Sequence, residues 1–335
     1  MIIIFKTEAI IMRFLNKTIS FAAAAMIAAA SLTACSGAGK PKTDKLSIVC
    51  VSFPEYDWTR NIIGSTDSAE ITYLLGSGMD IHNYQPGAKD MLTISGCDIF
   101  IFTGGNSETW TEDVLSNAGN KEMKTIRLFD LLGQDLKEEE LKEGMEPEEE
   151  DEDHGGTEYD EHIWLSLKNA ERLCENICDV ICEADPSNSS AYHANLTSYT
   201  EKLRELDSEY AEMADKASVK TVIFGDRFPF RYLMDDYGID YYAAFPGCSA
   251  ETAASFETVA TLADKLDSLQ LDTVFIIENS DDSIARSIIN NSKSRNASIE
   301  KLNSIQSVTR KDIDSGASYT SIMKNNLETL KKVLN

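Results

Sequence analysis

The stretch from Asn188 to Lys216, NSSAYHANLTSYTEKLRELDSEYAEMADK, decides the architecture of this chain. It runs for 29 residues without a glycine or a proline, and Asp185-Pro186-Ser187 just before it ends one helical pattern and starts the next. At 1.5 Å per residue a helix of this length spans roughly 43 Å, which exceeds the diameter of a small domain. We therefore expect a rigid linking helix, within residues 186–217, that joins two lobes.

Apolar, β-rich runs alternate with helical patterns on both sides of this helix. In a first lobe, residues 46–185, strands are expected at 46–52, 71–75, 99–103 and 124–128. In a second lobe, residues 218–335, strands are expected at 221–224, 239–243 and 273–277. Such alternation is typical of a mainly parallel sheet covered by helices. The predicted fold class is α/β, with two βα lobes joined by one long helix.

Residues 1–34 have the pattern of a bacterial lipoprotein signal peptide. Arg13 and Lys17 precede a short apolar run that ends in Leu32-Thr33-Ala34-Cys35, and a small-residue cleavage site of this kind marks secretion. We expect lipidation of Cys35, a tether over residues 35–45, and a location on the extracytoplasmic face of the bacterial membrane. No later stretch is long and apolar enough to cross a bilayer. The start codon could be that of Met1 or of Met12.

The chain is strongly acidic, with a net charge of -25, of which -13 falls between Asp135 and Glu161. A polyanion is a poor ligand for nucleic acid, whose affinity depends on cations that neutralise phosphates, whereas it attracts cations. Within this acidic loop, Glu146–Asp153 carries almost no apolar residue, so we expect a disordered, solvated segment. His154 closes the acidic run and is a candidate for accessory metal capture.

Three of the seven cysteines, Cys174, Cys178 and Cys182, fall four residues apart and so share one stripe of a helix. Buried cysteine behaves as a small hydrophobic residue, and we expect this stripe to face the core. A thiolate metal site would need a fourth ligand and closer pairing. Spacing alone assigns no disulfide to the remaining cysteines, and His193 on the linking helix is expected to be structural.

Two histidines stand in segments that resemble a known family. The segments are Asp80-Ile81-His82-Asn83-Tyr84-Gln85-Pro86 and Tyr159-Asp160-Glu161-His162-Ile163-Trp164. Both are similar to metal-ligand segments of the solute-binding lipoproteins of zinc and manganese ABC importers, of the zinc-uptake-like cluster A-I type. Tyr237-Gly238 and the stretch Ser318–Leu327 also look like this family. The resemblance covers essentially all of the chain beyond Cys35.

The resemblance implies a divalent metal bound in the cleft between the lobes, with His82 and His162 as ligands. It also implies two partners, an integral-membrane permease and its cytoplasmic ATPase. The third ligand position of the family falls on Arg227, and a cation cannot ligate a cation. Asp226 beside it is the nearest carboxylate, which could equally be an ion-paired loop residue.

The fourth ligand position of the family falls near Ser304 and Ile305, where no carboxylate stands. Glu278 ends an apolar strand, at the edge of the sheet where ligands usually lie, and is our candidate, with Asp281 behind it. Two imidazoles and one or two carboxylates do not choose cleanly between Zn2+ and Mn2+. We place Zn2+ first, because it outranks Mn2+ at a given site.

The expected function is capture of the metal and its delivery to the permease, without enzymatic activity. One alternative is a surface adhesin, because this fold has been associated with adhesion. The other is a zinc hydrolase, for which Glu161 is the only candidate general base. A hydrolase needs an open coordination position and a base, and the sequence contains no His-Glu-x-x-His motif or close His-x-His pair.

Overall fold

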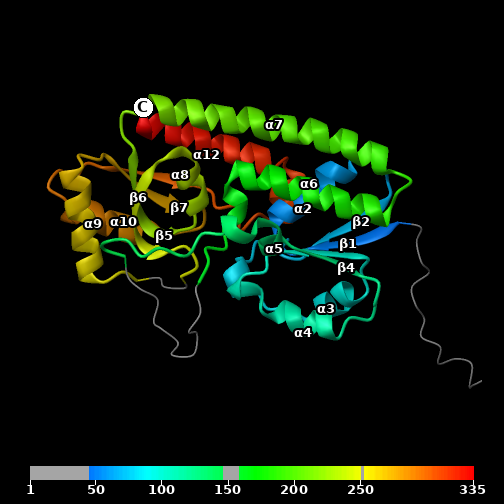
Figure 1. Ribbon diagram of the computed structural model, residues 1–335. Helices are drawn as coiled ribbons and strands as arrows, with labels where there is room; N and C mark the ends of the chain where they lie inside the picture. The colour runs from blue at the N-terminus through cyan, green and yellow to red at the C-terminus, as the bar shows by residue number, and fades with distance from the viewer. Residues whose placement is uncertain (1–44, 146–157, 250–252) are drawn as a thin grey trace, which may run out of the picture. The chain divides into compact units, whose positions relative to one another are not determined.

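The computed structural model describes residues 45–145, 158–249 and 253–335. Two parallel four-stranded sheets form two α/β lobes, and the strand order is equivalent in both, β2-β1-β3-β4 in the first and β6-β5-β7-β8 in the second (Figure 1). The fold-class prediction is confirmed. The lobe boundaries remain predictions.

In the first lobe, parallel strands alternate with helices that cover both faces of the sheet. Its strands are β1 (Leu46–Cys50), β2 (Ala69–Tyr73), β3 (Ile99–Phe102) and β4 (Lys124–Arg127). Its helices are α2 (Phe53–Ile63), α3 (Ala88–Ser95), α4 (Trp110–Ser116), α5 (Leu128–Leu132) and α6 (Leu167–Ala184). Strand β3 is buried along its whole length, as expected for a strand in a parallel sheet that is covered on both faces.

The second lobe repeats this pattern. Its strands are β5 (Thr221–Phe228), β6 (Asp240–Pro246), β7 (Thr273–Ile277) and β8 (Ser298–Leu302), and its helices are α8 (Arg231–Tyr237), α9 (Phe256–Ser268), α10 (Ser283–Asn291) and α11 (Arg310–Asp314). Along β7, Val274 and Ile276 pack with α9 and α10, while Phe275 and Ile277 face the main core. The sequence analysis did not predict β8.

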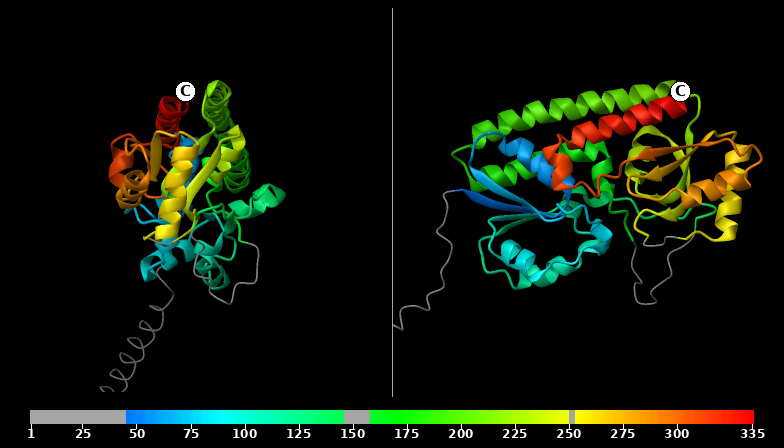
Figure 2. Two further views of the ribbon diagram at one scale, coloured as in Figure 1. Left: turned by 90° about the vertical axis from the view of Figure 1, so that its left-hand side faces the viewer. Right: turned by 180° about the vertical axis from the view of Figure 1, so that it is seen from behind.

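The long helix α7 (Ser189–Lys216) forms as predicted, and a second helix, α12 (Tyr319–Leu334), lies beside it along both lobes (Figures 1 and 2). At its start, α7 is bound to α2, where the Asn195 side chain donates to the carbonyl of Ile62 (3.0 Å). Further along, the Tyr210 hydroxyl donates to the carbonyl of Met323 in α12 (2.7 Å). Two helices, not one, therefore join the lobes.

The segment that leads into the acidic loop lies along the second lobe. The Lys137 amide donates to the Tyr232 hydroxyl (2.9 Å), and Lys265 pairs with Glu143 (2.7 Å). Residues 137–145 therefore contact α8 and α9, although they precede the linking helix in the sequence. The expected signal peptide, Cys35, Glu146–Asp153 and His154 lie outside the described residues. Within the part described, no helix combines the length and apolar character needed to cross a membrane.

Candidate metal centre

His82 lies beyond the carboxyl end of β2, in the short 3-10 helix Ile81–Asn83. Asp80 caps this helix, and its side chain accepts a hydrogen bond from the His82 amide (3.1 Å). The His82 Nδ1 atom lies 2.6 Å from the Ser107 hydroxyl, which follows β3, and 3.8 Å from Glu161 Oε2. Segments that follow β2 and β3, the two strands on either side of β1, thus hold the ring at the edge of a parallel sheet where ligands usually bind.

His162 is fully buried and directly precedes the 3-10 helix Ile163–Leu165. Asp160 accepts from the His162 amide (2.8 Å), and the same carboxylate oxygen lies 3.0 Å from His162 Nδ1. The Trp164 ring stands edge-on to the imidazole, and its Nε1 donates to the carbonyl of Ser304 (2.9 Å). A carboxylate on the far nitrogen of an imidazole orients the ring and makes it a better metal ligand.

The structure brings the two imidazoles together, with their Nε2 atoms 3.1 Å apart. An ionised carboxylate only accepts hydrogen bonds, so the contact with Asp160 assigns the proton to His162 Nδ1 and a lone pair to its Nε2. The side-chain oxygen of Gln306 accepts from Arg227, so its side-chain nitrogen is the atom that faces His82 Nε2, at 3.3 Å. This nitrogen can only donate, so His82 Nε2 also presents a lone pair. Two lone pairs at this separation repel each other unless a cation or a proton lies between them.

The protonation state of His82 also suits metal binding. Burial lowers its pKa to about 3, with further lowering from the neighbouring His162 ring and from Arg227. The ring is therefore neutral at physiological pH, which is the form that binds a metal. In a tetrahedral zinc site with bonds near 2.05 Å, two ligand nitrogens lie ~3.3 Å apart, close to the separation seen here.

Cys248 completes a group of three candidate ligands. Its Sγ atom and one nitrogen each of His82 and His162 all lie within 4.8 Å of one another. Cys248 follows β6 in the second lobe, and its amide donates to Glu139 (3.2 Å). Burial raises the pKa of its thiol well above the ordinary value, so an ion must displace the proton when it binds.

Gly247 allows this close approach of the second lobe to His162. A Cβ atom built on Gly247 would lie 2.8 Å from the carbonyl oxygen of Phe228 and 3.0 Å from Cε1 of His162. The second distance is at the lower limit of real Cβ contacts and the first is below it. Glycine therefore lets the backbone before Cys248 lie against the imidazole.

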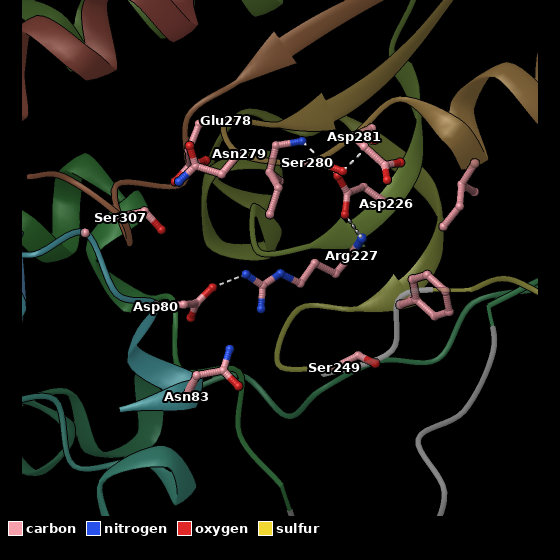
Figure 3. A pocket seen from close by; sticks show the side chains of 14 residues that line it. Asp80, Asn83, Asp226, Arg227, Ser249, Glu278, Asn279, Ser280, Asp281 and Ser307 are labelled. Carbon is pink, nitrogen blue, oxygen red and sulfur yellow. Dashed lines mark hydrogen bonds and ion pairs between the residues drawn. The ribbon is translucent and has the colours of Figure 1, made fainter. Parts of the chain in front are cut away.

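Arg227 extends from β5 across to the first lobe, where its guanidinium pairs with Asp80 (Figure 3). The β5 register shifts between Phe224 and Arg227, and such bulges re-aim side chains next to functional sites. The guanidinium holds the pKa of Asp80 below its usual range. Arg227 is thus not a ligand but part of a tie between the two lobes.

The structure does not bring Asp226 or Glu278 into the group formed by His82, His162 and Cys248. Asp226 accepts from the amides of Arg227 (2.9 Å) and Ile277 (3.1 Å). Glu278 accepts from the amide and the hydroxyl of Ser304, both at 2.8 Å. Both carboxylates, with Asp281, line an adjoining pocket of about 450 Å³ that Arg227 also lines (Figure 3). Their oxygens hold the ends of strands in place, so we do not retain them as ligands.

Sequence reasoning missed Cys248 and Gln306. Cys248 stands alone in the sequence, and only the pairing of β6 with β5 places it opposite the histidines. The available signal was a soft ligand just after a predicted strand, Ile239–Ala243. Gln306 lies one residue beyond the positions where the fourth family ligand was expected, and its amide does reach His82.

Two α/β lobes joined along a long helix, with two imidazoles meeting where the strands end, agree with the family that the sequence comparison shows. The chain belongs to the family described as "Zinc-uptake complex component A periplasmic", whose model matches residues 48–333.

Two relatives illustrate the relationship. The zinc-binding lipoprotein AdcA of Streptococcus pneumoniae (strain ATCC BAA-255 / R6) is 33% identical over 313 residues, covering 92% of this chain but 59% of AdcA. This chain thus spans about three fifths of that relative. The high-affinity zinc uptake system protein ZnuA of Bacillus subtilis (strain 168) is 28% identical over 313 residues, covering 92% of this chain and 94% of ZnuA.

Solved structures agree with this assignment. The Zn(II)-bound ZnuA-like domain of Streptococcus pneumoniae AdcA matches with a TM-score of 0.68 at 29% identity, covering 87% of this chain and 99% of that one. The laminin-binding protein Lmb of Streptococcus agalactiae, described as an adhesin with metal transporting activity, matches with a TM-score of 0.71. At 21% identity, with 87% and 100% of the chains covered, Lmb shows the shared fold alone.

Proposed function

We propose that this protein captures Zn2+ outside the cytoplasm and delivers it to an integral-membrane permease driven by a cytoplasmic ATPase. The observation that carries the proposal is the pair of Nε2 atoms of His82 and His162, 3.1 Å apart, each on a ring whose other nitrogen has a polar partner. The names of AdcA and ZnuA, which refer to zinc binding and zinc uptake, support the choice of cargo.

The donor set favours zinc over manganese. Imidazole suits zinc, and a thiolate is a soft ligand that selects zinc over Mn2+, whose preferred ligands are oxygens. With Cys248 as the third ligand, the centre has two nitrogens and one sulfur, leaving a fourth position for water or an oxygen ligand. This set differs from the two-carboxylate set expected from the sequence, in which Asp226 and Glu278 closed the shell.

We also propose that the protein is held to the membrane through lipid on Cys35. The support is the Leu32-Thr33-Ala34-Cys35 sequence and the naming of AdcA as a lipoprotein. An anchored receptor stays close to its permease. His154 and the acidic stretch before it remain candidates for weak, accessory capture of the same ion.

The two other functions considered from the sequence lack support. Glu161, the candidate base of a hydrolase, accepts from the Ser107 amide (2.9 Å) and lies beside His82 Nδ1, on the side of that ring away from His162. It therefore supports the ligand and does not face the centre. No feature of residues 45–145, 158–249 or 253–335 favours adhesion.

Competition for Zn2+ against a chelator of known affinity tests the proposal. His82→Ala, His162→Ala and Cys248→Ser should each weaken the tightest zinc site, with the histidine changes having the larger effect. Cys97→Ala, at another free cysteine in the first lobe, is the matched control and should bind as the wild type does. Cells lacking the protein should grow poorly at limiting zinc, and the double histidine variant should not rescue them. An unchanged affinity of the tightest zinc site in that double variant would refute the proposal.

A further inference from the structure

A second group of side chains that could bind a metal, separate from the His82–His162 centre, lies where α6 packs on α7. Cys178 and Cys182 come from the last turns of α6, and His193 comes from the first turns of α7. The two Sγ atoms lie 3.9 Å apart. The imidazole lies 3.8 Å from Cys178 through Nδ1 and 3.7 Å from Cys182 through Nε2.

Two of these separations match edges of a tetrahedral metal site. With Zn–S bonds near 2.3 Å and Zn–N bonds near 2.05 Å, two sulfurs lie ~3.8 Å apart and a sulfur and a nitrogen lie ~3.6 Å apart. The sulfur–sulfur distance and one sulfur–nitrogen distance agree with these values within a few tenths of an ångström. An imidazole offers one nitrogen to an ion, and the three ligand atoms chosen in this way lie within 4.8 Å of one another, so a small rotation of the exposed His193 ring would complete the geometry. The closer pairing that the sequence alone could not show for Cys178 and Cys182 is therefore present, and a third ligand stands beside it.

The group is also accessible from solvent. Cys178 is buried, Cys182 is half-buried and His193 is exposed, so one side of the cluster opens to water. Water can then fill the fourth coordination position. The strongly negative chain attracts cations to its surface, and Asp179, next to Cys178, adds a negative charge at this place.

We propose that Cys178, Cys182 and His193 form a second binding site for a thiophilic cation of the zinc class. Two thiolates and a neutral imidazole balance the charge of a divalent ion. Soft sulfur ligands exclude Mg2+, Ca2+ and Mn2+, which prefer oxygen. The proposal does not depend on the His82–His162 centre.

Burial of the Cys178 thiol does not oppose this assignment. Burial raises its pKa to about 12, with a further contribution from Cys182, so the free thiol is neutral. A bound zinc-class ion deprotonates a coordinating thiol outright. Binding therefore releases protons to solvent, and affinity falls as the pH falls.

An ion at this site would hold two helices together across a turn. Residues 185–188 connect α6 to α7, and Asp185 already accepts from the Tyr192 hydroxyl there (2.6 Å). The ion would add bonds from α6 to α7 on the other side of this turn. Because α7 spans both lobes, the site would stiffen one end of the helix that sets their spacing.

Titration of the purified chain with Co2+ tests this inference, because cobalt bound to thiolate shows sulfur-to-metal charge-transfer absorption. The wild type should bind two ions per chain. Cys182→Ser and His193→Ala change accessible residues and should each reduce this number to one. His82→Ala/His162→Ala should lose the other ion and keep a thiolate band. Cys174→Ala, one turn earlier on the same cysteine stripe, is the matched control and should still bind two.

The outcomes separate the two sites. A wild type that binds a single ion, with a stoichiometry unchanged by Cys182→Ser and His193→Ala, would overturn this inference while leaving the first centre intact. Two free thiols lost to a Cys178–Cys182 disulfide in the native chain would also overturn it. Conversely, a second ion that disappears with Cys182→Ser, in a chain whose histidine double variant binds zinc normally, would support this site and refute the first.

Discussion

The two lobes meet at the carboxyl ends of their parallel strands, but they bring different chemistry to that edge. The first lobe contributes both imidazoles, each with a partner on its Nδ1 atom. The second lobe contributes a thiol, Cys248, an amide, Gln306, and a guanidinium, Arg227. In lobes with equivalent strand order, ligand chemistry is therefore a property of the loops and not of the sheet.

This difference indicates an order of events in metal capture. The imidazoles are held by contacts within the first lobe, from Ser107 and Asp160, and need no movement of the second lobe to be oriented. Cys248 comes from the other lobe, on the loop that follows β6. We expect the imidazoles to bind the ion first and Cys248 to close the shell. Two helices, α7 and α12, limit how far the lobes separate.

The largest expected effect comes from removing a first-lobe ligand. His82→Ala or His162→Ala should weaken zinc binding by more than ~100-fold, since loss of an outer-shell partner alone costs about 10–100-fold. Chelator competition measures this change. His193→Ala is the control, and the tight site should keep its affinity in that variant. Equal losses from Cys248→Ser and His82→Ala would break the comparison, because the lobes would then contribute alike.

The next largest effect concerns the stability of the fold. In each lobe, a buried carboxylate accepts hydrogen bonds from backbone amides beside a strand end. Glu55 accepts from the amides of Val51 and Ser52 near β1, as Glu278 does from Ser304 in the second lobe. Burial raises the pKa of Glu55 to about 8. The protonated form is favoured on folding, so its stabilising effect is full below about pH 4.5 and is lost as the pH rises through 8.

Glu55→Gln should therefore flatten the pH dependence of the free energy of unfolding between about pH 4.5 and 8, where a raised pKa of this size contributes on the order of a few kcal/mol. Urea denaturation at a series of pH values measures the slope. Glu70→Gln, at an exposed position on β2, is the control and should keep the slope of the wild type. An unchanged slope in Glu55→Gln would show that other buried acids carry the effect.

Much of the fold was predictable because it depends on local patterns. The 29 residues without glycine or proline predicted α7 to within one residue. Strand β8 was missed because its sequence, SIEKL, carries charges typical of an edge strand with one exposed side. The position of helix α12 beside α7 was not predictable, because it depends on packing contacts between residues far apart in the sequence.

The site was predictable only where residues carried a motif. His82 and His162 were found through their flanking segments, and the structure places them together. Cys248 has no such segment, and Asp226 and Glu278 were chosen for their position at strand ends, where they bind backbone amides instead. The nearness of Cys182 to His193 depends on how two helices rotate against each other across a turn, which periodicity does not reveal.

A smaller effect is expected from the partners that orient the first-lobe ligands. Asp160→Asn keeps the size of the side chain but removes the charge that faces His162 Nδ1. Zinc affinity should fall by about 10–100-fold, the usual cost of losing an outer-shell partner. Asp236→Asn is the matched control, because the Asp236 carboxylate accepts from the Ser166 hydroxyl (2.6 Å) instead of facing an imidazole nitrogen. An unchanged affinity in Asp160→Asn would mean that the ring is held by packing alone.

The smallest effect should come from the acidic stretch Glu146–Asp153, which carries seven carboxylates. Replacing these with Gln and Asn, at constant length, should slow zinc association by at most ~10-fold at low ionic strength, because the stretch acts by raising the local cation concentration. The difference should disappear in high salt, where the screening length is only a few ångströms. Stopped-flow mixing with a fluorescent zinc chelator measures both rates.

The variant with Gln and Asn in Glu146–Asp153 also tests whether the first lobe supplies every strong ligand other than Cys248. Dissociation of zinc should be unchanged, since steering affects encounter and not the bound state. His154→Ala, made separately, distinguishes a ligand from a diffuse field, because removal of a neutral imidazole does not alter the charge. A loss of zinc affinity in His154→Ala as large as that in His82→Ala would identify His154 as a third histidine ligand and would contradict the division of ligands between the two lobes.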